Sequence, residues 1–261
     1  MRVPSFDLLG IRLHAMTRYD LVRATAEAVD NGKRYIIANH NLHSLYLWCC
    51  EPKMREFYSL ADYTNIDGMP LVLLGRLLGL PFKSEHRTQC VDLLPLLMDK
   101  AVNHHWRTFY LGSRPGVAAK AAQLLRTRYP GLRIATRDGH FDTSRFGKHN
   151  RSVLAEIREF DPDILMVGMG MPRQEIWILE NRKDISARAI LCCGGLMDLV
   201  AGEIPTAPRW LGPLCLEWLY RLFSEPARLW RRYLIEPWLI LMYMANRYLR
   251  KVNPSPKSSH D

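Results

Sequence analysis

Short apolar segments alternate with amphipathic segments along most of the chain, and this alternation restricts the fold more than any other feature. Five apolar runs have the length of buried strands, at 34–38, 108–111, 132–136, 164–168 and 189–193. Stretches with helical spacing of apolar residues separate them, at 19–31, 93–102, 117–129, 151–160 and 174–180. Apolar strands that alternate with helices predict an α/β fold, in which a parallel, Rossmann-like sheet is covered by helices on both faces.

The carboxyl ends of these strands are the expected place for a binding site. Open parallel sheets bind their ligands beyond that edge. The residues that fall there are Asn39, Asn41, Gly112, Gly168 and Gly194. The sequence therefore predicts a site assembled from several strand ends in a catalytic domain that spans residues 1–204.

The last part of the chain has a different composition. From Pro205 onward it is rich in proline and arginine, and it contains four of the seven tryptophans of the protein. We expect a basic, helical appendage over residues 205–252 and a disordered, polar tail over 253–261. The apolar stretch 233–248 is interrupted by Glu236 and Pro237, so it suits a helix that lies on a membrane rather than one that crosses it.

The charge and the cysteines narrow the class of protein. A net charge of +10 favours anionic partners, which include nucleic acid, an acidic lipid surface and phosphate-bearing substrates. Neither a helix-turn-helix nor an aromatic RNA-binding signature is present, so no nucleic-acid partner is expected. The six cysteines lack C-x-x-C spacing, and the N-terminus has no signal-like apolar stretch. Both observations favour a cytoplasmic protein with reduced thiols.

Two glycine-containing segments join a predicted strand to a predicted helix. In 112–116, Gly-Ser-Arg-Pro-Gly, free backbone N–H groups and the helix dipole favour a phosphate or nucleotide at Gly112 and Gly116, although a plain tight turn is the alternative. The segment matches neither a Walker A nor a G-x-G-x-x-G fingerprint, so it does not favour a kinase or a dehydrogenase. The second segment, 168–175, places Gln174 and Glu175 in the first turn of a helix, where they could bind a ligand or merely cap the helix.

A single carboxylate is the candidate catalytic base. Asp67 lies in the glycine-containing turn 65–70, Asn-Ile-Asp-Gly-Met-Pro, directly ahead of an apolar run that predicts a helix. A positioned carboxylate of this kind can take the proton of a reacting hydroxyl group. The alternative is an ordinary Asp-Gly turn.

No metal or other cofactor is expected. Asp161 and Asp163 match an Asp-x-Asp metal signature, but they precede a predicted strand and so belong at the opposite edge of the sheet. The nine histidines show no H-x-x-x-H spacing.

Arginines of the appendage are then the candidates to bind and neutralise a phosphate or diphosphate group. Arg221, Arg228 and Arg231 have spacings that suit one helical face, although Pro226 interrupts a continuous helix. The alternative, compatible with the first, is a basic amphipathic segment that binds anionic lipid.

Several separated motifs resemble those of the WecG/TagA/CpsF glycosyltransferase family, over roughly residues 19–233. They are the segments 65–70, 168–175 and 217–221, the last reading Glu-Trp-Leu-Tyr-Arg. The Thr-x-Asn pair of the family corresponds to Asn39 and Asn41, with Asn in place of Thr. The family segment Arg-Val-Thr-Gly-x-Asp corresponds to 87–92, where Arg87 and Asp92 match while Gln89 and Cys90 depart.

The resemblance implies an inverting, metal-independent transfer of a hexose from a UDP-sugar to a polyprenyl-diphosphate-linked sugar. Asp67 would be the base, Asn39, Asn41, Arg87 and Gln174 would hold the two substrates, and the appendage arginines would stabilise UDP. The protein would act on the cytoplasmic face of the inner membrane as a peripheral protein in contact with anionic lipid. A homo-oligomer through apolar helices such as 71–78 is a further expectation.

The donor sugar is the least determined element. The departures at Asn39, Gln89, Cys90 and Thr206 favour UDP-glucose and exopolysaccharide synthesis over the other donors of the family. The alternatives are UDP-N-acetylmannosamine or UDP-N-acetylmannosaminuronate, for wall teichoic acid or enterobacterial common antigen. The non-enzymatic alternative is a protein that binds a lipid-linked sugar or a membrane without turnover.

Overall fold

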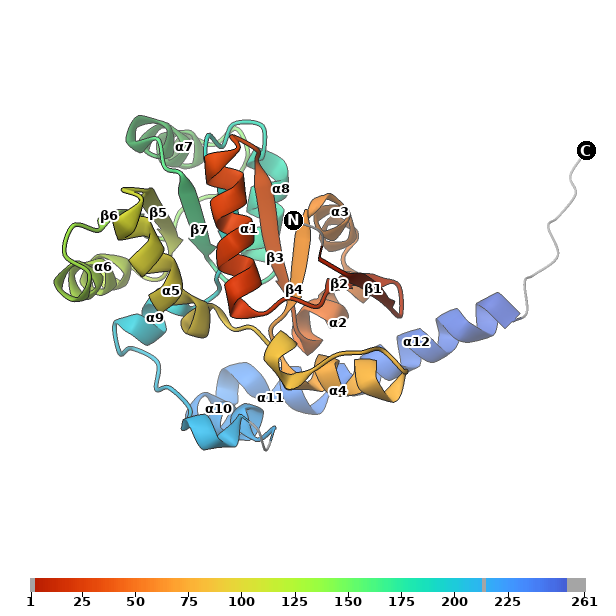
Figure 1. The fold of residues 1–261 in the computed structure, drawn as a ribbon. Coiled ribbons are helices and arrows are strands. Elements are labelled where there is room, and N and C mark those ends of the chain that lie inside the picture. The colour runs from red at the N-terminus through yellow and green to blue at the C-terminus, as the bar shows by residue number, and fades with distance from the viewer. Residues whose placement is uncertain (1–2, 213–214, 253–261) are drawn as a thin grey trace, which may run out of the picture.

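The computed structural model describes residues 3–212 and 215–252. Its centre is a six-stranded sheet in the order β4-β3-β8-β7-β5-β6, in which every neighbouring pair is parallel (Figure 1). The strands are β3 (Tyr35–His40), β4 (Tyr63–Ile66), β5 (Arg107–Gly112), β6 (Arg133–Arg137), β7 (Ile164–Gly168) and β8 (Ala189–Cys192). The predicted parallel sheet is confirmed, and only β4 was not among the predicted strands.

Helices cover both faces of the sheet, as predicted. One face packs against α1 (Arg18–Asp30), α5 (Cys90–Asn103), α6 (Val117–Arg128) and α9 (Leu196–Val200). The other face packs against α3 (Pro52–Leu60), α7 (Lys148–Phe160) and α8 (Arg173–Asn181). Side chains alternate between these faces along each strand, so that Ile37 belongs to the first core and Ile36 to the second.

A third apolar cluster lies beyond the β4 edge of the sheet. It contains the antiparallel hairpin β1 (Ser5–Leu8) and β2 (Ile11–His14), the helices α2 (Leu42–Cys50) and α4 (Met69–Leu77), and part of α12 (Glu236–Val252). The hairpin and α2 and α3 were not predicted from the sequence. The apolar run after Asp67 does form the expected helix, α4, and a short 3-10 turn, Ser84–His86, follows it.

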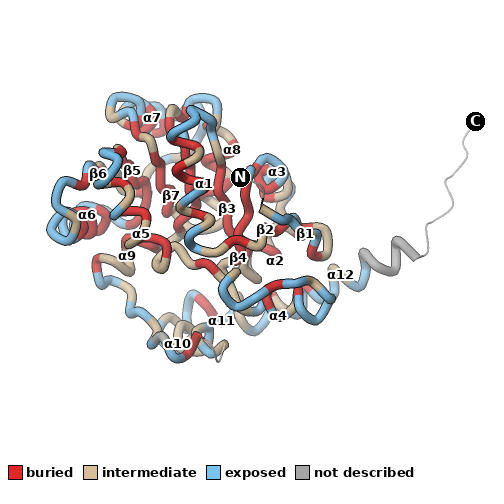
Figure 2. Tube along the Cα trace, viewed as in Figure 1, coloured by how far each residue is buried: buried red, intermediate tan, exposed pale blue. Residues whose placement is uncertain are grey.

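The appendage consists of a 3-10 turn, Arg209–Leu211, and the helices α10 (Glu217–Ser224), α11 (Pro226–Leu234) and α12. Pro226 separates α10 from α11, which confirms the predicted interruption. Most of the appendage is exposed or half-buried, whereas the strands of the sheet other than the edge strand β6 are mostly buried (Figure 2). Within the described residues, no helix combines the length and the apolar character that crossing a membrane requires. The predicted disordered tail, 253–261, lies outside the described residues.

Candidate active site

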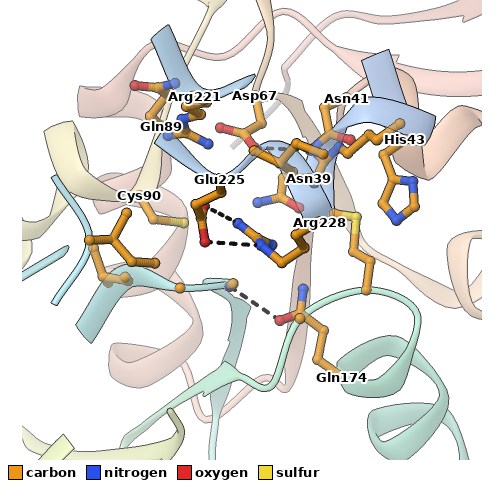
Figure 3. Close-up of a pocket in the computed structure, with 18 of the residues that line it drawn as sticks. Asn39, Asn41, His43, Asp67, Gln89, Cys90, Gln174, Arg221, Glu225 and Arg228 are labelled. Atoms are coloured by element: carbon orange, nitrogen blue, oxygen red, sulfur yellow. Dashed lines mark hydrogen bonds and ion pairs between the residues drawn. The ribbon is translucent and has the colours of Figure 1, made fainter. Parts of the chain in front are cut away.

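A cavity of about 620 Å³ lies between the carboxyl edge of the sheet and the appendage. The core lines it with residues at or just after the ends of β3, β4, β7 and β8 and at the start of α5, and α10, α11 and α12 close it from the other side (Figure 3). Of the predicted site residues, seven line this cavity: Asn39, Asn41, Asp67, Gln174, Arg221, Arg228 and Arg231. The structure thus brings together side chains from both ends of the sequence.

Asp67 follows β4 and is held by its backbone and by one neighbouring amide. Its N–H donates to the carbonyl oxygen of His40 at 2.8 Å, and Asn41 Nδ2 donates to its Oδ2 at 3.3 Å. Burial raises the pKa of Asp67 above the ordinary range of an aspartate, while the Arg221 guanidinium and the Asn41 hydrogen bond oppose that shift. A carboxylate with a raised pKa is a stronger proton acceptor, which suits a general base.

The two asparagines at the carboxyl end of β3 have different tasks: Asn39 belongs to the strand, and Asn41 follows it. Asn41 is the N-cap of α2, where its Oδ1 accepts from Ser44 N at 3.0 Å, so its Nδ2 is fixed toward Asp67. Asn39 donates from Nδ2 to the carbonyl oxygen of Cys192 at 3.3 Å. Its Oδ1 has no hydrogen-bond partner within the described residues, although the side chain is buried. Asn39 therefore keeps a buried acceptor without a partner in the described chain, beside the cavity that its side chain lines.

Gln174 is locked at the start of α8. Its Oε1 accepts from Gly194 N at 3.1 Å (Figure 3). Its Nε2 donates to Glu175 Oε1 at 2.7 Å. Both side chains are completely buried. Burial raises the pKa of Glu175 to about 7, and the hydrogen bond from Gln174 only partly opposes this. Glu175 accepts from the Gln174 amide and so helps to orient it at the cavity wall.

The appendage supplies four arginines to the cavity: Arg221, Arg228, Arg231 and Arg232. Arg228 is paired with Glu225, its Nε lying 3.1 Å from Oε1 (Figure 3). Arg232 was not among the predicted site residues, although it is half-buried and its charge acts on Asp67. Its position next to Arg231 was the only sequence signal that could have indicated it.

Two side-chain contacts attach the appendage to the core. Arg87 Nη2 contacts Glu217 Oε2 at 2.5 Å, and His43 Nδ1 lies 2.7 Å from Glu236 Oε2. Both glutamates are the first residues of their helices. Arg87 was predicted to contact substrate. It lines neither this cavity nor the second, smaller cavity described below, and its ion pair with Glu217 holds α10.

Three other predicted contacts also lie outside the cavity: Asp92, Gly112 and Gly116. Asp92 is in the first turn of α5. Gly112 is required by packing, because a Cβ there would lie 2.2 Å from the carbonyl oxygen of Gly168. Gly116 opens α6 in the left-handed conformation at φ 83°. A substrate role for these residues stays a prediction, as it does for Arg87.

A second cavity of about 220 Å³ adjoins the first. Its walls come from the start of α4, from α10 and α11, and from the first turn of α12. Six residues line both cavities: Asn41, His43, Asp67, Gln89, Arg221 and Arg232. Asp67 consequently lies where the two cavities meet.

The Asp-x-Asp pair lies where the sequence predicted, at the amino end of β7 and away from the cavity. Asp163 accepts from Arg107 N at 2.9 Å and pairs with Arg188 at 2.6 Å, so it connects the ends of neighbouring strands. Within the described part of the chain, no group of three or more His, Cys, Asp or Glu side chains is arranged to hold a metal ion.

A carboxylate at the carboxyl edge of a Rossmann-like sheet, facing several arginines, is typical of a transferase that acts on phosphate-bearing substrates. The sequence model described as "Glycosyl transferase WecG/TagA/CpsF family" matches residues 6–254. The chain belongs to the WecG/TagA/CpsF glycosyltransferase family, and the predicted membership is confirmed.

Curated relatives agree with this assignment. An N-acetylglucosaminyldiphosphoundecaprenol N-acetyl-beta-D-mannosaminyltransferase of Bacillus spizizenii is 33% identical over 209 residues, which cover 80% of this chain and 78% of the relative. An enzyme of the same name from Staphylococcus aureus is 26% identical over 255 residues, which cover 94% of both chains. The names of these relatives correspond to the N-acetylmannosaminyl alternative rather than to the expected glucose transfer.

Proposed function

We propose that the protein transfers an N-acetylmannosaminyl residue from a UDP-sugar to a sugar carried on a polyprenyl diphosphate. The observation that carries this proposal is the position of Asp67, a carboxylate of raised pKa that faces arginines across a large cavity. The donor is chosen from the names of the relatives. UDP-glucose is the competing donor, because the departures from the family motifs favoured it. The experiment below distinguishes the two donors.

The proposed chemistry is a direct displacement with inversion. The acceptor oxygen forms a bond to the anomeric carbon as the bond from that carbon to the UDP oxygen breaks. Asp67 takes the hydroxyl proton, and the electron pair of the broken bond leaves on UDP. Asn41 holds one carboxylate oxygen of Asp67, so that the other, Oδ1, can face the acceptor.

Arginine is proposed to replace a metal in stabilising the departing UDP. Arg221 and Arg231 line the cavity without an ion pair to any carboxylate of the described chain. Arg228 would exchange Glu225 for a phosphate oxygen, because both are anionic acceptors of the same guanidinium. Charge-assisted hydrogen bonds of this kind strengthen as negative charge develops on the leaving group.

The acceptor is proposed to be reached from the membrane surface, on its cytoplasmic face. The appendage exposes large apolar side chains beside its arginines, including Phe223, which is 78% exposed, and Trp238, which is 68% exposed. Aromatic side chains together with arginines favour the interface of an anionic bilayer. This arrangement supports peripheral attachment.

The test is UDP release by the full-length protein in detergent with a polyprenyl-diphosphate-linked N-acetylglucosamine. UDP-N-acetylmannosamine, UDP-N-acetylmannosaminuronate and UDP-glucose are compared, each with and without EDTA, beside Asp67→Asn. We expect turnover with UDP-N-acetylmannosamine that resists EDTA and is lost in Asp67→Asn. Turnover only with UDP-glucose would replace the donor, and activity that survives in Asp67→Asn would remove Asp67 as the base.

A further inference from the structure

We infer that the smaller cavity binds the head group of the lipid-linked acceptor, with the larger cavity left to the nucleotide sugar. The inference rests on the proposed transfer and adds which space each substrate occupies. It also assigns a path for the polyprenyl chain. Four structural observations support it: the shared wall, the difference in lining, the arginines within reach, and the helix faces at the outer rim.

The shared wall places the base where two substrates must meet. In a direct displacement, the acceptor hydroxyl approaches the anomeric carbon opposite to the leaving diphosphate, so donor and acceptor come from different sides. Asp67 lines both cavities and is therefore within reach of a hydroxyl that enters from the smaller one. The second cavity opens beside the base, so it gives the acceptor an approach that is separate from the space for the donor.

The linings differ in a way that separates the two substrates. The larger cavity is bordered by the glycines 170, 194 and 195 and by Arg228 and Arg231, which suits the close approach of a diphosphate and a nucleotide. The smaller cavity is bordered by Met69, Pro70, Trp218, Tyr233 and Pro237. The Trp218 and Tyr233 rings have centroids 6.0 Å apart and form an aromatic wall. Aromatic faces of this kind pack well against the C–H face of a pyranose.

The smaller cavity also has the charge that a diphosphate needs. Arg221 and Arg232 line it as well as the larger cavity. Burial lowers the pKa of Arg232, while the charge of Asp67 raises it, so the guanidinium stays charged next to the base. One pair of arginines can therefore contact phosphate on either side of the reacting centre.

The outer rim continues as apolar helix faces. Pro70 lines the cavity at the start of α4, and Leu73 and Leu77 follow it on the same face, 45% and 82% exposed. Pro237 lines it at the start of α12, and Leu241, one turn further, is 59% exposed. Helices α4 and α12 pack into one apolar cluster, so both faces begin at the same opening. A polyprenyl chain that leaves the cavity would pass onto these side chains.

The first experiment measures steady-state kinetics with a short, water-soluble prenyl-diphosphate-linked N-acetylglucosamine as the acceptor. Trp218→Ala removes the aromatic wall, and Pro70→Trp narrows the opening at an exposed helix position. The matched control is Trp230→Ala, an exposed tryptophan of α11 that lines neither cavity. We expect the acceptor KM to rise about tenfold in both variants, with the donor KM and the affinity for UDP within about twofold of wild type.

The second experiment tests the lipid path by comparing a soluble acceptor with one that carries a longer prenyl chain. Leu77→Gln should remove most of the preference for the longer chain and leave kcat/KM for the short acceptor unchanged. Leu124→Gln, an exposed leucine of α6, is the control and should change neither value. Leu77 is exposed, so its substitution leaves the core packing intact.

The outcomes separate the inference from the proposed function. If wild-type protein shows no transfer with any donor, the proposed function fails and the inference falls with it. If wild type transfers but Trp218→Ala and Pro70→Trp raise the donor KM, or change neither KM, the assignment of the cavities is overturned while the function stands. If Leu77→Gln keeps the chain-length preference, the lipid path is wrong.

Discussion

The core edge and the appendage contribute to one cavity by different physical means. At the core edge, polar side chains are buried or half-buried and held by hydrogen bonds to the core, as Gln174 is between Gly194 and Glu175. In the appendage, the arginines lie on largely exposed helices. The Arg87–Glu217 ion pair, the His43–Glu236 contact and a few buried apolar residues such as Leu229 and Ile240 attach these helices to the core. The core edge therefore fixes the positions of its polar groups, whereas the positions of the arginines depend on how the appendage is attached.

The largest expected effect comes from removing the base at the core edge. Asp67→Asn should lower kcat by about a thousandfold, since positioned proton transfer contributes factors of this size. The affinity for UDP, measured by calorimetry, should fall by less than about threefold, because the amide keeps the shape of the carboxyl group. If kcat stays within tenfold of wild type, the catalytic base is another group.

Removing a cation of the appendage is expected to have the next largest effect. Arg228→Met should lower kcat/KM by about a hundredfold, and Arg228→Lys should recover little of it, because an ammonium group lacks the bidentate geometry. Arg158→Met, at an exposed position on α7, serves as the control. Full activity in Arg228→Lys would show that only the charge matters there.

Glu175 gives a prediction for stability that belongs to the core alone. Its pKa is about 7 in the folded protein and near 4.5 when it is exposed, so between these pH values the folded state holds the extra proton. The free energy of unfolding should therefore fall as pH rises from 4.5 to 7, by roughly 3 kcal/mol at most from this group. Urea titrations of Glu175→Gln should lack this contribution relative to wild type. Parallel pH curves for the two proteins would contradict it.

The smallest predicted effect concerns the attachment of the appendage. If Arg87 acts by holding Glu217, then Arg87→Met, Glu217→Gln and the double variant should each lose about tenfold in kcat/KM, because they break the same contact. Losses that multiply in the double variant would instead show that Arg87 contacts substrate. That result would restore the role that the sequence predicted for it.

The difference between the core edge and the appendage also explains which features could be predicted from the sequence. Strands such as β7 are continuous apolar runs, and their pattern alone gave the parallel sheet and the residues at its edge. β4, Tyr63–Ile66, was missed because it is only four residues long and its last two residues, Asn65 and Ile66, were assigned to the glycine-containing turn 65–70. Arg232 and the pairing of Arg87 with Glu217 depend on contacts between distant segments, which no local pattern reports.

The measurement that tests the link between the two regions most directly is the pH dependence of kcat/KM for wild type and Arg221→Met. Asp67 must be unprotonated to act, and Arg221 is the strongest of the charges that lower its pKa. Without Arg221, the acid limb of the profile should move to higher pH, whereas the control Arg158→Met should leave it in place. An acid limb at the same pH in wild type and Arg221→Met would contradict a base at the core edge that is tuned by the appendage.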